Sequence, residues 1–312
     1  MNSSVLNVQE LCDQVASFLQ ESKWDLRACS LVSPALTSAA QRHLFSDIIF
    51  NRGSLDIDDI SLLERYDEVK VCGRFCAVLK TSPHLIPYVR RMRISLESGV
   101  LKLLTKFEFP NLHDVVFHRR RGGAASEEVI ALAAQLIGAP SIRRVGLVSP
   151  IFDTLHDMSG LFDKHTPALD SIFLYNITFN KTIAEAGDPP SMKSPRVSVK
   201  TLRWGLHQQL DPAMMLDPAF PLNFSALVEL DFGAQLTPVM QKLVERARCS
   251  IRRLSLDAQH VANDDYASSA QPTFLAQLPA LTHLTLSSTA HHLADAEILP
   301  VPPTPAKQPP RP

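Results

Sequence analysis

The chain has 312 residues, a hydrophobic fraction of 45% and a formal net charge of −1, from 31 basic against 32 acidic residues. This length and composition favour a globular protein of roughly one to three domains that can bury real cores. The balanced charge argues against general binding to nucleic acid or to anionic membranes, because both need a basic excess on one face.

Targeting signals and cysteine usage indicate an intracellular protein. The N-terminus lacks a basic region followed by an apolar run, so we expect no signal peptide. No run of about 18 apolar residues predicts a membrane span. The five cysteines form an odd, scattered set, which suits a reducing compartment: Cys12, Cys29, Cys72, Cys76 and Cys249. We therefore expect a cytoplasmic or nuclear location.

Three short helices are predicted within residues 5–50. Asp25 is the expected N-cap of the second helix, and Ser33 followed by Pro34 is expected to begin the third. A core made by three such short helices is small, so a partner that covers its leftover apolar surface would stabilise it. The first helix is indicated by apolar residues at i, i+4, i+7 and i+8, which are Leu11, Val15, Phe18 and Leu19.

The segments "LNVQELCDQVASFL" and "DLRACSLVSPALTSAAQRHLFSDIIF" resemble the F-box, as found in the large F-box families of mushroom-forming fungi. The run "LRACSLVS…AAQRHLF" is the most specific part, whereas the Leu-Pro pair and the third-helix Trp common in the family are absent. The resemblance implies docking on the Skp adaptor of SCF-type cullin–RING ubiquitin ligases. By resemblance the docking residues are Leu6, Leu11, Val15, Leu19, Leu26, Leu31, Val32 and Leu36. A purely internal role in the helical core is the alternative for each of them.

From residue 89 onward the pattern apolar-x-x-apolar-x-apolar recurs at intervals of about 23 to 30 residues, a period typical of leucine-rich repeats. Helix-compatible stretches at 126–138 and 237–248 lie between the matches, so a parallel sheet lined by helices is expected. The ninth repeat position carries no asparagine, which favours an irregular solenoid; an α/β sheet without regular curvature is the alternative. The matches are 89–94, 112–117, 142–147, 169–174, 199–204, 227–232, 251–256 and 281–286.

The positions on either side of the fourth pattern residue are expected to face away from the helices, because side chains alternate along a strand. This face would be basic at its start, then aromatic, then acidic, a mixture that suits a protein partner better than a polyanion. An ordinary solvated strand face is the alternative. The residues expected to bind a target protein are Arg91, Arg93, Phe173, Tyr175, Arg203, Glu229 and Asp231.

Three further features have both a functional and a structural interpretation. Arg119–Arg121 would clamp a phosphate or an acidic peptide, or simply lie exposed. Cys72 and Cys76 share one helix face, where small packing residues are commoner than a metal or redox pair. The tail 300–312 has seven prolines in thirteen positions and contains a PxxP match within an expected disordered segment.

We expect no catalytic activity, no metal and no cofactor. Motifs that cradle phosphate, ligate zinc or activate a serine or cysteine nucleophile are absent, and only 11 glycines are present. His291, His292 and Asp295 would ligate a metal only with a fourth ligand that the sequence does not offer.

The sequence thus predicts an α/β protein in four parts: an F-box-like module (5–50), a helical linker (51–81), a leucine-rich-repeat-like domain (82–290) and a disordered proline-rich tail (291–312). The expected function is the substrate receptor of an SCF-type ligase, which holds a target protein near a ubiquitin-charged enzyme and makes no bonds itself. The alternative is a protein-interaction scaffold whose F-box-like block no longer docks.

Overall fold

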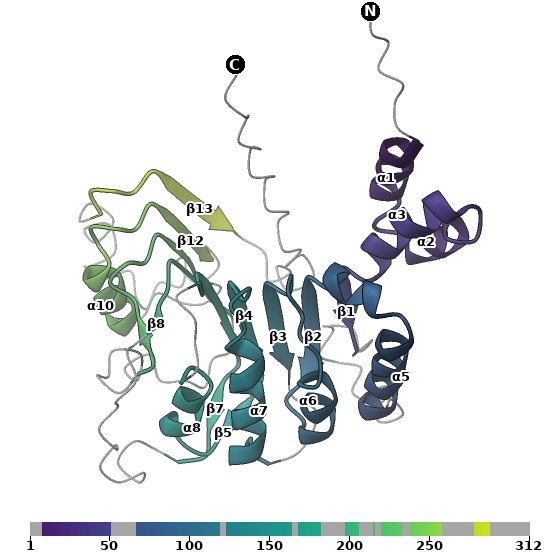
Figure 1. Ribbon diagram of the computed structural model, residues 1–312. Helices are drawn as coiled ribbons and strands as arrows, with labels where there is room; N and C mark the ends of the chain where they lie inside the picture. The colour runs from purple at the N-terminus through teal and green to yellow at the C-terminus, as the bar shows by residue number, and fades with distance from the viewer. Residues whose placement is uncertain are drawn as a thin grey trace, which may run out of the picture.

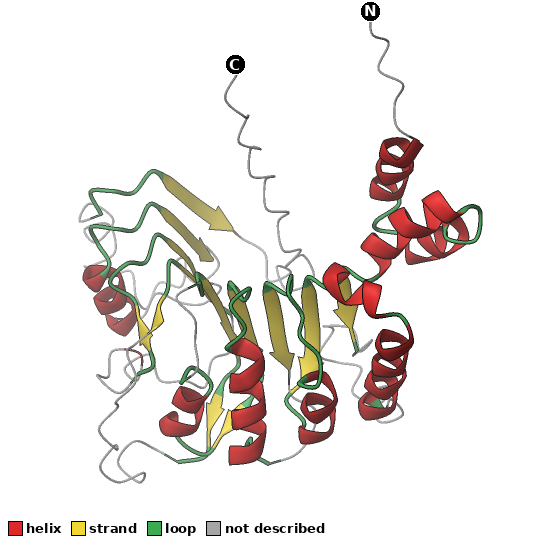
Figure 2. Ribbon diagram, viewed as in Figure 1, coloured by secondary structure: helices red, strands yellow, loops and turns green. Residues whose placement is uncertain are grey.

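The computed structural model shows an α/β protein in which one large parallel sheet carries helices along one face (Figures 1 and 2). Three further helices extend from the N-terminal end of the sheet. The structure describes residues 8–50, 67–118, 123–163, 168–181, 197–205, 215, 220–232, 238–257 and 278–287. Leu6, Arg119–Arg121, the segment 51–66 and the proline-rich tail lie outside these residues.

The first three helices are α1 (Val8–Phe18), α2 (Lys23–Cys29) and α3 (Pro34–Leu44). The predicted start of α3 is confirmed, because the Ser33 side chain accepts a hydrogen bond from the backbone amide of Leu36 and Pro34 is the first helical residue. The prediction of Asp25 as N-cap of α2 is wrong. Ser22 has that role, and its hydroxyl accepts from the Asp25 amide, so the helix begins earlier than expected.

Nine parallel strands form the main sheet of the described residues, and they follow one another across it in chain order. The smaller pairs β5 (Ile151–Phe152) with β7 (Thr178–Phe179), and β8 (Val197–Ser198) with β10 (Leu222–Asn223), lie beside it. The nine strands are β1 (Asp47–Ile49), β2 (Arg91–Ser95), β3 (Asp114–His118), β4 (Arg144–Val148), β6 (Ser171–Tyr175), β9 (Thr201–Trp204), β11 (Glu229–Phe232), β12 (Arg253–Asp257) and β13 (His283–Ser287).

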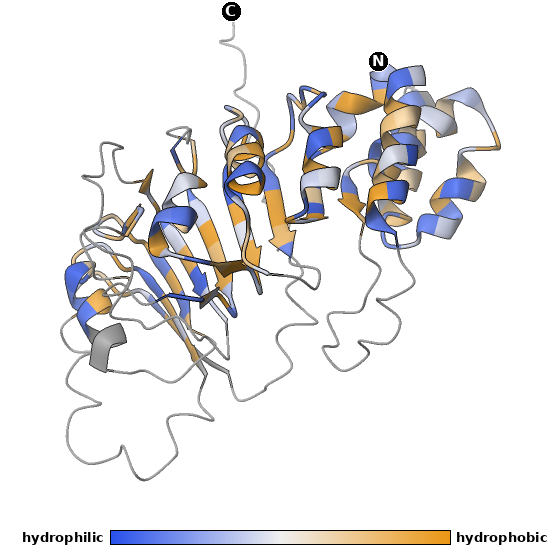
Figure 3. Cartoon of the chain, turned by 90° about the horizontal axis from the view of Figure 1, so that it is seen from below, coloured by the Kyte–Doolittle hydropathy of each residue, from blue (hydrophilic) through white to orange (hydrophobic). Residues whose placement is uncertain are grey.

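The recurring apolar pattern is confirmed as the strand signal, because one strand begins at the third position of each of its eight matches. In the first match Val89 is buried just before β2, and Met92 and Ile94 point into the core. Figure 3 shows the resulting hydrophobic stripes along the strands. The same positions are filled along the sheet by Leu112, Val115, Phe117, Ile142, Val145, Leu147, Leu169, Ile172, Leu174, Val199, Leu202 and Trp204.

The helical layer covers these apolar side chains on one face of the sheet, and its first four α-helices contact one another in chain order. The predicted helix at 126–138 is confirmed as α7: the Ser126 hydroxyl caps it, two acids occupy its first turn and Gly138 ends it. The layer consists of α5 (Glu68–Thr81), the 3₁₀ helix η1 (Pro83–Tyr88), α6 (Ser98–Leu104), α7 (Glu127–Ile137), α8 (Leu155–Gly160) and α10 (Pro238–Arg246).

A strand and a helix show that the packed α/β body begins earlier in the chain than the sequence indicated. Strand β1, within the block predicted as purely helical, pairs in parallel with β2. Helix α5, within the predicted linker, buries Cys72, Cys76 and Leu79 in the main core. Phe75 of α5 also stacks on Phe45 at a centroid distance of 6.4 Å. Residues 47–49 and 68–81 therefore belong to the packed α/β body.

Candidate functional site

The three N-terminal helices enclose a very small core. Among the described residues, its fully buried members are Ala16, Leu26, Ala39 and Ala40, of which Leu26 has the largest side chain. The partly buried Cys12, Leu19, Cys29 and Leu44 pack against them. An ion pair of 2.9 Å between Arg42 and Asp13 ties α3 to α1 at the surface. Because alanines bury little area, this core supplies little hydrophobic stabilisation by itself.

The predicted docking residues divide into an inner and an outer group. Leu26 is completely buried, and Leu19 packs against the same core, so both stabilise the helices from inside. Leu36 is partly buried. The outer group is solvent-exposed and consists of Leu11, Val15, Leu31 and Val32, with exposed fractions of 44%, 46%, 87% and 71%.

Two large exposed side chains were missing from the predicted docking set. Phe18 is 87% exposed at the end of α1, and Trp24 is 76% exposed in α2. The guanidinium of Arg27 lies 5.2 Å from the centroid of the Trp24 ring, a cation–π contact. The spacing Leu11, Val15, Phe18 could have identified Phe18, since these residues share one helix stripe; Trp24 carries no comparable sequence signal. Exposed apolar groups on this scale are typical of interaction surfaces.

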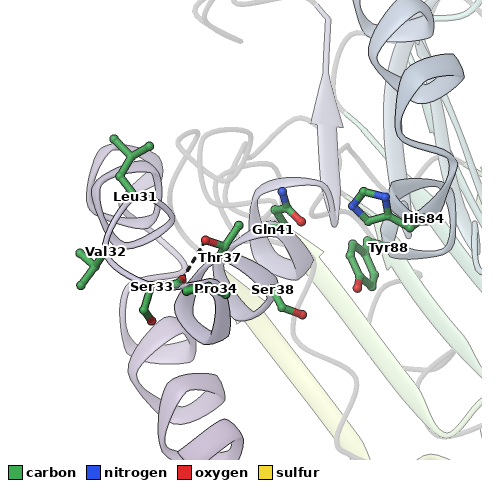
Figure 4. A pocket seen from close by; sticks show the side chains of 9 residues that line it. All are labelled: Leu31, Val32, Ser33, Pro34, Thr37, Ser38, Gln41, His84 and Tyr88. Atoms are coloured by element: carbon green, nitrogen blue, oxygen red, sulfur yellow. Dashed lines mark hydrogen bonds between the residues drawn. The ribbon is translucent and has the colours of Figure 1, made fainter.

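A shallow groove of about 510 Å³ runs along α3 from the α2–α3 turn to η1 (Figure 4). The turn contributes Leu31, Val32 and Pro34, and η1 contributes His84 and Tyr88. The Thr37 hydroxyl, also at the groove, donates to the carbonyls of Ser30 and Ser33 at 2.6 and 2.8 Å. These hydrogen bonds fix the backbone of the turn that carries the exposed Leu31 and Val32.

The second candidate surface is the sheet face opposite the helices. Neighbouring strands pair in one continuous register, so equivalent side chains form rows across the sheet. One row reads Asp47, Arg91, Asp114, Arg144, Ser171, Thr201 and Glu229, and the next reads Ile49, Arg93, Val116, Gly146, Phe173, Arg203 and Asp231. The predicted outward positions therefore lie together on this face.

The predicted target-binding residues differ in their exposure. Tyr175 is only 5% exposed and stacks on Phe173 with a centroid distance of 6.3 Å, so it supports Phe173 and offers little surface itself. Burial also raises the pKa of Tyr175. The other six are partly exposed, namely Arg91, Arg93, Phe173, Arg203, Glu229 and Asp231.

A buried polar cluster joins α5 to the carboxyl ends of β2 and β3. Glu68 is 2% exposed, and its carboxylate accepts from the Ser95 amide at 2.7 Å and lies 3.5 Å from Nε2 of His118. Ser95 is completely buried. No sequence pattern indicates this cluster, because its members are far apart in the chain. A serine enclosed in this way offers no surface to a substrate, so the cluster's geometry supports a structural role.

The two cysteines of α5 lie in the core. The Cys72 and Cys76 thiols approach the carbonyl oxygens of Val100 and Leu103 at 3.9 and 3.8 Å. Among the residues that the structure describes, no three His, Cys, Asp or Glu side chains come together as a metal site. In the same residues no helix has the length and apolar character needed to cross a membrane.

Comparison with known proteins adds no assignment. No protein-family model matches the chain, and no curated protein matches it. The functional interpretation therefore rests on the sequence and the two surfaces described above.

Proposed function

We propose that the chain is the substrate-receptor subunit of an SCF-type cullin–RING ubiquitin ligase. Residues 5–50 act as the F-box and dock on the Skp adaptor, and the sheet domain acts as an irregular leucine-rich-repeat solenoid that holds a target protein. The ligase supplies the chemistry, and the receptor raises the concentration of target lysines near the ubiquitin-charged enzyme. Such a receptor works in the cytoplasm or the nucleus.

The observation that carries the proposal is the exposure of large apolar side chains on a helical unit with a small core. Phe18 and Leu31 are each 87% exposed, whereas the interior of the unit is mostly alanine. Burial of one such side chain by a partner is worth roughly 1.5–3 kcal/mol. A docked adaptor would therefore supply the stabilisation that this unit lacks on its own.

The test is co-purification of the full chain with the Skp adaptor. The double variant Leu31→Asp, Val32→Asp places two charges on the exposed turn and should abolish binding while leaving the circular dichroism spectrum unchanged. The matched control is Val69→Asp, Val78→Asp, which adds the same two charges at valines of α5 that are 38% and 42% exposed. Failure of the folded wild type to bind, or equal binding by the double variant, would overturn the proposal and favour a non-ligase scaffold.

A further inference from the structure

Five arginines lie in or directly before β2 and β4, and we refer to them as the arginine cluster. Arg91, Arg93 and Arg144 stand in the outward rows of the sheet, and Arg90 and Arg143 are the residues just before the two strands. Strand β3 lies between the two strands, with Asp114 in register with both Arg91 and Arg144. The backbone holds the flanking residues in place, because the amide of His113 donates to the Arg90 carbonyl and the amide of Arg143 donates to the His113 carbonyl.

The acids near the cluster leave most of its charge unpaired. Asp114 is 4% exposed, with its Oδ2 3.7 Å from Nε of Arg144, and it is enclosed beneath the arginines. Arg143 lies 3.8 Å from Asp170, but that carboxylate is held more closely by Lys200, at 2.7 Å. Within the described residues, Arg90, Arg91 and Arg93 form no ion pair.

The positive charge of the cluster affects the pKa of the neighbouring His113 imidazole. Burial, followed by the charges of Arg144, Arg91, Arg90 and Arg143, lowers the pKa of His113 to about 4. The histidine is therefore neutral at pH 7 and adds nothing to the charge of the cluster. The neighbouring carboxylates are Asp47, Asp114 and Asp170, fewer than the five guanidinium groups, so this region is positive.

An aromatic side chain lies beside the cluster in the same rows. Gly146 of β4 pairs with Phe173 of β6, and Phe173 pairs with Arg203 of β9. Between Arg93 and Phe173 this row holds Val116 and Gly146, and the methyl groups of Val116 lie over Gly146, which has no side chain. The surface between the cluster and the Phe173 ring is therefore apolar and carries no charge. Phe173 is three strands from β2, about 14 Å at a strand spacing of about 4.8 Å.

We propose that this face binds an extended, acidic segment of the target protein. Carboxylate or phosphate groups of the segment pair with the arginine cluster, and an apolar side chain about four residues away rests on Phe173. The planar guanidinium group of arginine binds either a carboxylate or a phosphate through two parallel hydrogen bonds. An extended chain covers about 14 Å in about four residues. The inference rests on the proposed function, because it treats this face as the target-binding surface.

The experiment uses the full chain and fluorescence anisotropy with labelled synthetic peptides in a glycine–serine background. One probe carries two adjacent glutamates and a phenylalanine four residues later; the others carry two phosphoserines or two lysines in place of the glutamates. We expect both anionic probes to bind, with affinity falling as NaCl is raised, and the lysine probe not to bind. Preference for the phosphoserine or for the glutamate probe identifies which anion the target supplies.

Charge reversal locates the site on the chain. The variant Arg90→Glu, Arg93→Glu should weaken binding of the anionic probes at least about tenfold, and it leaves the Arg144–Asp114 pair intact. The control Arg74→Glu, Arg248→Glu makes the same charge change at two exposed arginines outside the sheet, and should leave the affinity unchanged. Placing the phenylalanine directly beside the glutamates should also weaken binding.

Each contrary result overturns the inference. One such result is that the folded wild type binds neither anionic probe in a salt-dependent way. The other is that the two double variants lose affinity equally. Adaptor binding is measured on the same preparations and depends on Leu31 and Val32, not on the arginines. Failure with the peptides while the adaptor still binds therefore rejects only the acidic-segment inference, whereas loss of adaptor binding alone rejects the ligase assignment.

Discussion

The Glu68 carboxylate at the start of α5 accepts a hydrogen bond of 2.7 Å from the Ser95 amide at the end of β2. The acceptor is buried, with 2% of Glu68 exposed. The bond ties the helical layer to the carboxyl end of the sheet. Burial acts to raise the pKa of Glu68, but the nearby His118 imidazole and the Ser95 amide more than offset it, so the pKa is lowered.

We expect Glu68→Gln to destabilise the fold by about 1–3 kcal/mol at pH 7, because the amide is a weaker acceptor for the buried Ser95 amide. Because the pKa of Glu68 is lower in the folded state, its charged carboxylate stabilises the fold at pH values above the unfolded-state pKa. This stabilisation is lost as the pH falls through the folded-state pKa. The difference between variant and wild type should therefore shrink below about pH 4. Urea unfolding at several pH values measures it, with the exposed Glu108→Gln as control. A difference that is independent of pH would contradict the charged role.

His113 should make stability fall in mild acid. Its pKa is lowered to about 4 by burial and by the surrounding arginines, so the unfolded chain takes up a proton near pH 6.5 and the folded chain only near pH 4. Between these values the wild type should lose about 1–2 kcal/mol relative to His113→Gln, after allowance for solvent screening. Unfolding midpoints between pH 7 and pH 4 test this. A parallel pH profile for the two proteins would rule it out, and the exposed His156→Gln is the control.

Two glycines should respond to alanine in opposite directions. A Cβ at Gly205 would fall within the ring of Tyr175, a buried side chain with little freedom to move, so Gly205→Ala should cost about 1–3 kcal/mol. A Cβ at Gly73, inside α5, meets nothing within 4 Å, so Gly73→Ala should gain about 0.5–1 kcal/mol from helix propensity. Thermal unfolding of both variants gives the comparison. Stabilisation by Gly205→Ala would show that the ring moves aside.

Thiol alkylation should distinguish the cysteines by depth. Cys249 is exposed, whereas Cys72 is completely buried, and its hydrogen bond with Cys76 and its burial raise the pKa of the Cys72 thiol. We expect iodoacetamide to modify Cys249 first in the native protein and Cys72 only after unfolding. Mass spectrometry of timed samples identifies each modified peptide. Native modification of Cys72 at the rate of Cys249 would require local opening of α5.

The strands were predictable because their signal is local. A buried residue before each strand and two inward residues within it repeat at every match, for example Val89, Met92 and Ile94. The alternation of side chains then identified the outward arginines of β2 without knowledge of the pairing. The helix caps at Ser33 and Ser126 were predictable for the same reason. Each serine hydroxyl accepts a hydrogen bond from the backbone amide three residues later in the chain.

The parallel strands, their outward side chains and the short N-terminal helices were thus predictable from the sequence, because they depend on periodicity and caps within a few residues. Tertiary structure alone decided that Leu26 is enclosed while Leu31 is exposed, since both are leucines of one short segment. It also decided that β1 joins the sheet and that Glu68 meets Ser95 and His118. Those contacts join residues that are distant in the chain, and no local pattern records which distant partner a side chain will meet.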